Sequence, residues 1–151
     1  MNNTIAIIGG GPVGAIFALL NKSQTSKIFL LESNSQNQTK NDKRALALSN
    51  GTKFILEKID IWKDLEDRLT PIKTIHTSQK GTFGRSLMEA EEIEQEALGY
   101  IISYGDLVSV LQKKISNSKH IEALYDSELL SFKSKTNKQN LIFKYKSIEK
   151  S

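Results

Sequence analysis

The first thirty or so residues alternate short apolar runs with glycine and polar segments. Largely apolar runs cover 4–8 and 27–31, and the apolar stretch 13–20 between them is long enough for a helix. This pattern predicts a strand, a helix and a second strand, the unit that builds parallel sheets. Glu32 follows the second run, and the segment that joins the first run to the helix reads Gly9, Gly10, Gly11, Pro12, Val13 and Gly14.

The glycine segment has the features of a dinucleotide-binding turn. Gly9 permits the tight turn out of the strand, Gly11 lets a pyrophosphate approach the backbone, and Gly14 lets the helix pack close to the sheet. The N–H groups at the helix N-terminus attract phosphates. Glu32 lies eighteen residues after Gly14, near the spacing expected for an acid that binds a ribose hydroxyl. An acid at this position favours FAD or NAD over NADP. The alternative is an ordinary tight turn.

The middle of the chain predicts a loop, a helix and several extended segments. Residues 33–43 are polar throughout and indicate a loop. A helix is expected from near Gly51, with Ser49 or Asn50 as its N-cap. Its expected buried stripe consists of Phe54, Ile55, Lys58, Ile59 and Trp62, continued by Leu65 and Leu69. Extended segments are expected over 72–79, 82–88 and 98–103, with a turn at 80–81.

The last third predicts another helix and more strands. Asp106 is expected to cap a helix whose inner stripe consists of Leu107, Val108, Leu111 and Ile115. Residues 120–125 are expected to form a third parallel strand, and 129–132 and 141–145 an antiparallel pair. The fold class is therefore α/β, a Rossmann-like βαβ unit with three parallel strands plus antiparallel strands.

Composition narrows the chemistry. A chain of 151 residues suits one domain, and a hydrophobic share of 38% suits a globular protein. The net charge is +4, but the lysines of 133–146 are interspersed, which favours a solvated face over a nucleic-acid site. There is no cysteine, and His76 and His120 lack ligand spacing, so no metal site is expected. Without a signal peptide or an apolar span, a cytoplasmic location is expected.

Three further segments carry a resemblance to a known family. They are Arg44–Ser49 (Arg-Ala-Leu-Ala-Leu-Ser), 71–84 (Pro-Ile-Lys-Thr-Ile-His-Thr-Ser-Gln-Lys-Gly-Thr-Phe-Gly) and 97–102 (Ala-Leu-Gly-Tyr-Ile-Ile). Together with the glycine segment and Glu32, they resemble the FAD-dependent aromatic-ring hydroxylases of ubiquinone biosynthesis, in particular the 2-polyprenyl-6-methoxyphenol hydroxylase branch. The resemblance covers nearly the whole chain.

The resemblance implies the FAD-binding part of a flavin monooxygenase that hydroxylates a polyprenyl phenol, with NAD(P)H as the reducing co-substrate. The flavin supplies the oxidation chemistry and the protein supplies binding and orientation. Segment 72–103 would belong to the sheet over the substrate, and no catalytic residue is assigned. The implied cofactor-binding residues are Gly9, Gly10, Gly11, Pro12, Val13, Gly14, Glu32 and Arg44. Among them Gly9, Gly11 and Gly14 would contact the pyrophosphate, Glu32 the adenosine ribose and Arg44 the flavin nucleotide.

The chain also departs from that family. Its members are much longer and carry later Asp-Gly and Gly-Asp-Ala motifs, and an Arg or Gln often stands where this chain has Gly105-Asp106. Residues 1–151 are therefore expected to be a single FAD/NAD(P)-binding domain, the amino-terminal part of a larger hydroxylase, inactive alone. The resemblance also implies contact with a ubiquinone-biosynthesis complex and with the inner-membrane surface, and a second polypeptide is a further expected partner that would supply the missing half. The alternatives are an NAD-dependent oxidoreductase domain and a non-catalytic binding remnant or subunit.

Overall fold

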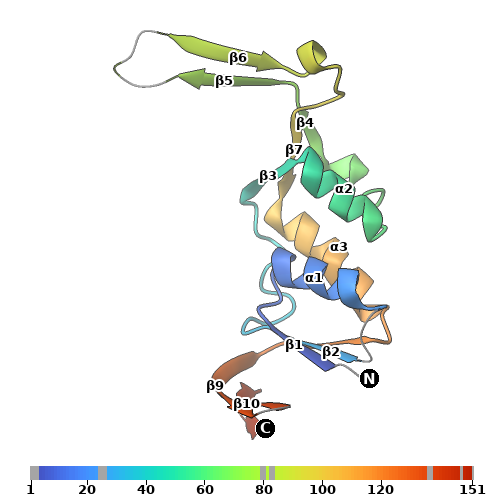
Figure 1. The fold of residues 1–151 in the computed structure, drawn as a ribbon, viewed down its shortest axis with the longest axis vertical. Helices are drawn as coiled ribbons and strands as arrows, with labels where there is room; N and C mark the ends of the chain where they lie inside the picture. Colours follow the sequence, from blue (N-terminus) through green and yellow to red (C-terminus); the bar gives the residue numbers. More distant parts are fainter. Residues whose placement is uncertain are drawn as a thin grey trace. The chain divides into compact units, whose positions relative to one another are not determined.

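The computed structural model describes residues 4–23, 27–78, 81, 84–135, 138–146 and 148–150 (Figure 1). The chain divides into two compact units. The first unit consists of 1–41 and 107–151, and the second of 42–106. None of the described helices is both long and apolar enough to cross a bilayer.

A three-stranded parallel sheet organises the first unit. Strand β2 (Lys27–Leu31) lies between β1 (Thr4–Ile8) and β8 (Ile121–Leu124) and is parallel to both. Ile28, Leu30 and Leu31 of β2 are buried, as expected for a central strand that is covered on its faces. The α/β fold with three parallel strands is confirmed, including the third strand expected near 120–125.

Helix α1 (Pro12–Asn21) connects β1 to β2 and packs on both strands. It buries Ala15, Ala18 and Leu19, and the two alanines let its backbone approach the sheet. Proline stands at its first turn, where a missing backbone N–H costs no helical hydrogen bond. The predicted strand–helix–strand unit is therefore present.

Helix α3 (Tyr104–Ser116) begins two residues before the predicted cap. Ser103 Oγ accepts a hydrogen bond from Asp106 N (3.1 Å) and donates one to Asp106 Oδ2 (2.5 Å). Ser103 is thus the N-cap and Asp106 is the third helical residue, a reciprocal arrangement that satisfies the first turn. The prediction that Asp106 caps the helix is wrong. The predicted inner stripe is confirmed, because all four of its side chains are buried.

The C-terminal segment of the first unit forms an antiparallel sheet. Strand β10 (Lys138–Tyr145) lies between β9 (Ser127–Lys135) and β11 (Ile148–Lys150), with a register irregularity between Ile142 and Phe143. The predicted antiparallel pair is confirmed and is longer than expected. Strand β11 was not predicted.

The second unit contains a three-stranded antiparallel sheet. Strand β7 (Gly99–Ser103) lies between β3 (Ala45–Ser49) and β4 (Thr70–Ile72). The two ends of the unit meet beside β3, because Tyr104 N donates to Arg44 O (2.8 Å) and Gly105 N donates to Asp42 O (2.9 Å). No strand was predicted for 45–49, and β3 is therefore a correction to the sequence interpretation.

Helix α2 (Asn50–Lys58) is shorter than predicted. Ser49 is its N-cap and accepts a hydrogen bond from Thr52 N (3.2 Å), which confirms one of the two expected caps. The predicted stripe is partly wrong, because Phe54 is 62% exposed whereas Leu56 is fully buried. Trp62 lies beyond the helix end and packs edge-on against Tyr100, with ring centroids 4.9 Å apart, so its predicted packing role is confirmed.

A two-stranded antiparallel ribbon, β5 (Thr74–Ser78) and β6 (Arg85–Glu89), follows β4 in the second unit (Figure 1). The predicted segment 72–79 is interrupted, because Ile72 pairs within β4 and Lys73 lies between the strands. Positions 79, 80, 82 and 83 of the predicted strands and turn lie outside the described residues. A short 3-10 helix, η1 (Glu66–Arg68), precedes β4, and another, η2 (Glu91–Ile93), carries part of the acidic run.

Candidate functional site

The turn after β1 depends on Gly9. Its φ is +101°, in the left-handed region that glycine adopts without a Cβ penalty. Gly9 N donates to Leu31 O (2.8 Å), which extends the β1–β2 pairing into the turn. The turn therefore begins at the carboxyl ends of two adjacent parallel strands, the edge at which α/β proteins hold ligands.

Gly14 lies against the same turn. A Cβ on Gly14 would overlap the carbonyl oxygen of Gly9 and would lie 3.3 Å from Ile7 Cγ2. Only a residue without a side chain allows this close approach of α1 to the end of β1. The glycine at this position thus serves the contact between helix and strand.

The first turn of α1 presents backbone donors. Gly11 is its N-cap and makes no side-chain cap hydrogen bond, and the first turn of α1 holds no acidic residue. The first intrahelical bond runs from Ala15 N to Gly11 O (2.9 Å), so the N–H groups of Val13 and Gly14 precede it. Val13 is 83% exposed. N–H groups without an intrahelical acceptor and the positive end of the helix dipole suit a phosphate.

The carboxylate of Glu32 faces this turn from the end of β2. Glu32 Oε2 accepts a hydrogen bond from Gly10 N (2.8 Å). Gly10 is tightly confined, because a Cβ there would lie 2.9 Å from Glu32 Cβ. Burial and, to a smaller extent, the charge of Glu32 raise the pKa of Tyr125, which follows β8. The structure therefore brings Glu32 and the glycine segment together.

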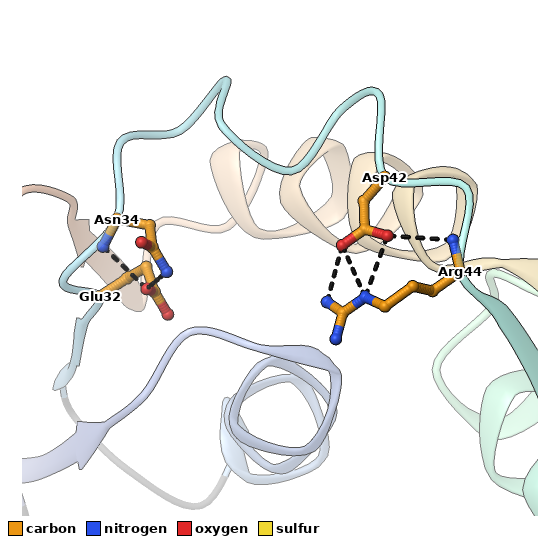
Figure 2. A network of polar contacts seen from close by, with 4 residues as sticks. All are labelled: Glu32, Asn34, Asp42 and Arg44. Carbon is orange, nitrogen blue, oxygen red and sulfur yellow. Dashed lines mark hydrogen bonds and ion pairs between the residues drawn. The ribbon is translucent and has the colours of Figure 1, made fainter.

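Asn34 is a partner of Glu32 that the sequence interpretation missed. Its backbone N and its Nδ2 both donate to Glu32 Oε1, at 2.9 and 2.8 Å (Figure 2). Ser33 Oγ makes a longer hydrogen bond, of 3.4 Å, to the same oxygen. The available signal was the asparagine two residues after the acid, because asparagine often hydrogen-bonds nearby groups in turns.

Arg44 belongs to the second unit, where it pairs with Asp42. Its Nε lies 2.9 Å from Asp42 Oδ2 and its Nη2 lies 2.6 Å from the same oxygen (Figure 2). Hydrogen bonds from the Arg44 side chain and backbone N–H hold the pKa of Asp42 below its ordinary value, and the same pairing raises the pKa of Arg44. The guanidinium also lies 4.6 Å from the centre of the Tyr104 ring. These two partners of Arg44 were not predicted.

Comparison with known families identifies the class of the fold. The model of the family described as FAD binding domain matches residues 2–149, nearly the whole chain. The chain belongs to this FAD-binding domain family. The helix N-terminus, the glycine turn and the acid beside it are consistent with that assignment, since together they suit a nucleotide diphosphate and its ribose.

Individual relatives are distant. This FAD-binding domain is 25% identical over 128 residues to an uncharacterised protein, slr1300, of Synechocystis sp., covering 85% of the chain and 31% of the relative. It superposes on p-nitrophenol 4-monooxygenase PnpA from Pseudomonas putida with a TM-score of 0.76 at 14% identity, covering 99% of the chain and 38% of that structure. The chain thus spans about a third of the length of these proteins.

A second solved structure has the same fold. It is the flavin-dependent monooxygenase PieE, in complex with FAD and substrate, with a TM-score of 0.75 at 15% identity. The match covers 95% of this FAD-binding domain and 27% of PieE. At this identity the two structures establish the fold that the domain shares with flavin-dependent monooxygenases.

Proposed function

We propose that the first unit holds the ADP half of FAD at the glycine turn. The observation that carries this proposal is the position of the Glu32 carboxylate, hydrogen-bonded to Gly10 N beside the open N-terminus of α1. The pyrophosphate would lie along Gly9–Gly14 and accept hydrogen bonds from the N–H groups of Val13 and Gly14. Glu32 would accept a hydrogen bond from the adenosine ribose.

Arg44 and segment 72–103 would serve the rest of the cofactor and the substrate. Arg44 is 71% exposed at its side chain, so its guanidinium has N–H groups to offer a flavin nucleotide while Asp42 holds it. Segment 72–103 would belong to the sheet over the substrate. Both assignments rest on the resemblance of Arg44–Ser49 and 71–84 to the ubiquinone-pathway hydroxylases.

The protein to which this domain belongs would be a flavin-dependent monooxygenase that hydroxylates a phenolic ring, with NAD(P)H as reductant. PnpA is named as a monooxygenase of p-nitrophenol, which is consistent with a phenolic substrate. The narrower proposal, a polyprenyl phenol of ubiquinone biosynthesis, rests on the sequence resemblance. A lipophilic substrate of this kind would bring the protein to a membrane surface and to other proteins of that biosynthesis, and a second polypeptide could supply the remaining length.

Nucleotide binding by the 151-residue chain tests the proposal directly. FAD and ADP are titrated by calorimetry into the parent chain, Glu32→Ala and the control Glu128→Ala, an exposed acid of β9. Hydrogen bonds to a charged group are worth about 1.5–3 kcal/mol, so Glu32→Ala should lose about tenfold to a hundredfold in affinity. Glu128→Ala should bind as the parent does. A parent chain that binds neither FAD nor ADP contradicts the proposal, and equal affinities of Glu32→Ala and the parent contradict the role of Glu32.

A further inference from the structure

We infer that Asn34 is a positioning residue that fixes the Glu32 carboxylate and leaves one of its oxygens, Oε2, for the ribose. This inference rests on the proposed binding of the ADP half of FAD. It adds the reason why Glu32 presents one particular oxygen, and it assigns that function to a residue outside the glycine segment.

The donors around Glu32 are divided unequally between its two oxygens. Oε1 accepts hydrogen bonds from the backbone N–H and the side-chain amide of Asn34, and a longer one from the hydroxyl of Ser33. Oε2 receives Gly10 N. A carboxylate oxygen accepts about two hydrogen bonds, so the described donors already occupy Oε1, whereas Oε2 keeps the capacity for one more.

Asn34 is itself held by a different part of the first unit. Asp126 N donates to Asn34 O (3.2 Å), and Ser127 N donates to Glu32 O (2.9 Å). Glu32 N in turn donates to Leu124 O (2.9 Å). The segment from the end of β8 to the start of β9 therefore anchors the backbone on which both the acid and its donor stand. The two N–H groups of Asn34 approach Glu32 from a fixed direction.

The fixed carboxylate has a consequence for binding. A glutamate side chain loses much rotational freedom when it is ordered, and this loss weakens binding if it occurs on ligand capture. Asn34 orders Glu32 before the ligand arrives, so a ribose hydroxyl meets Oε2 already in place. Removal of the Asn34 amide should therefore weaken recognition of the hydroxyl specifically, and leave pyrophosphate binding to α1 intact.

The test compares two ligands on each variant. ADP and 2′,3′-dideoxy-ADP, which lacks the ribose hydroxyls, are titrated by calorimetry into the parent chain, Asn34→Ala, Asn34→Asp and the matched control Asn37→Ala from the same exposed loop. The ratio of the two affinities measures hydroxyl recognition, and it is independent of the folded fraction of a variant. The parent should prefer ADP about tenfold, the size expected for one hydrogen bond to a charged group at a partly exposed site.

Asn34→Ala should reduce this preference to about threefold or less while binding dideoxy-ADP as the parent does. Asn34→Asp should reduce it at least as far, because its carboxylate repels Glu32 and offers no side-chain donor. Asn37→Ala should keep the parent's preference for ADP. In a chain that already carries Glu32→Ala, adding Asn34→Ala should not change this preference further.

Two other results overturn the inference. If Asn34→Ala lowers the affinity for both ligands equally, Asn34 has a structural role only. If it changes the affinity for neither ligand, Asn34 has no role in binding. Both leave the proposed function standing, since the parent still binds ADP. A parent chain that fails to bind ADP overturns the proposed function and this inference with it.

Discussion

Replacing Gly14 by alanine should destabilise the first unit, and the same replacement at Gly51 should stabilise the second. Both glycines lie in the first turn of a helix, Gly14 in α1 and Gly51 in α2. At Gly14 the new methyl group would overlap the Gly9 carbonyl oxygen. At Gly51 it would lie 3.6 Å from Ser49 Oγ, an ordinary contact. The pair therefore separates close packing from helix propensity.

The expected magnitudes follow from these contacts. Forcing an extra methyl group into a packed site costs about 1–3 kcal/mol, and the upper end applies at Gly14 because the obstacle is backbone. Alanine regains up to about 1 kcal/mol of helix propensity relative to glycine. The net result is about 2 kcal/mol of destabilisation for Gly14→Ala. For Gly51→Ala the propensity gain stands alone, and about 0.5–1 kcal/mol of stabilisation is expected.

Hydrogen exchange followed by mass spectrometry measures the local stability of both units in one experiment. A change of 2 kcal/mol in opening free energy alters the exchange of protected amides about thirtyfold. Amides of β1 and β2 should therefore exchange about thirty times faster in Gly14→Ala. Amides of α2 should exchange about two to five times slower in Gly51→Ala. If β1 and β2 in Gly14→Ala exchange as in the parent, the close approach of α1 to the turn does not limit the size of this residue.

Three further outcomes are expected. Gly11→Ala should bind ADP more weakly, because its methyl group would lie where the pyrophosphate is expected to approach the backbone. Its circular dichroism spectrum should be unchanged, because Gly11 has φ −65°, which alanine adopts readily. The pKa of Asp42, followed by NMR, should lie below its ordinary value and should rise toward it in Arg44→Ala, in which only the backbone N–H of residue 44 still donates to the carboxylate. The stabilisation from this pair should be present above the ordinary carboxyl pKa and disappear as the pH falls through the lowered one. The 151-residue chain incubated with FAD, NAD(P)H, oxygen and a short-chain prenylphenol should form no hydroxylated product above a flavin-only control, as judged by mass spectrometry.

The strand–turn–helix–strand unit could be predicted because its signals are local. Two apolar runs, a glycine turn and a following helix lie within 4–31, and each predicts its own conformation from neighbouring residues. Even the positive φ at Gly9 follows from the residue type that the turn requires. The position of Glu32 after β2 was likewise visible from spacing alone.

Strand β3 could not be predicted in the same way. Its sequence, Ala-Leu-Ala-Leu-Ser, contains good helix formers and is followed directly by a helix. It becomes a strand because it pairs with β7, whose Gly99 lies opposite Ser49 across a long separation in sequence. Tertiary pairing therefore overrides local propensity at this position.

The polar partners at the site were missed for a similar reason. Spacing predicts that an acid follows β2, but the donors that hold it depend on how the loop after it turns back. The backbone of Asn34 is anchored by Asp126, which is distant in sequence. Tyr104 likewise meets Arg44 because β3 and β7 pair side by side. Asp42 lies only two residues before Arg44, so this partner is a local one that the sequence interpretation overlooked.

The meeting of the two ends of the second unit has a consequence for the order of folding. Strand β8 must find β2 across a long intervening chain, and the entropy cost of closing such a loop grows with its length. Once the second unit has folded, the hydrogen bonds from Tyr104 N to Arg44 O and from Gly105 N to Asp42 O join its ends and remove most of that chain from the loop. The remaining closure becomes easier by about 1 kcal/mol. We therefore expect the second unit of a nascent chain to fold first, and β8 to pair with β2 in a later step.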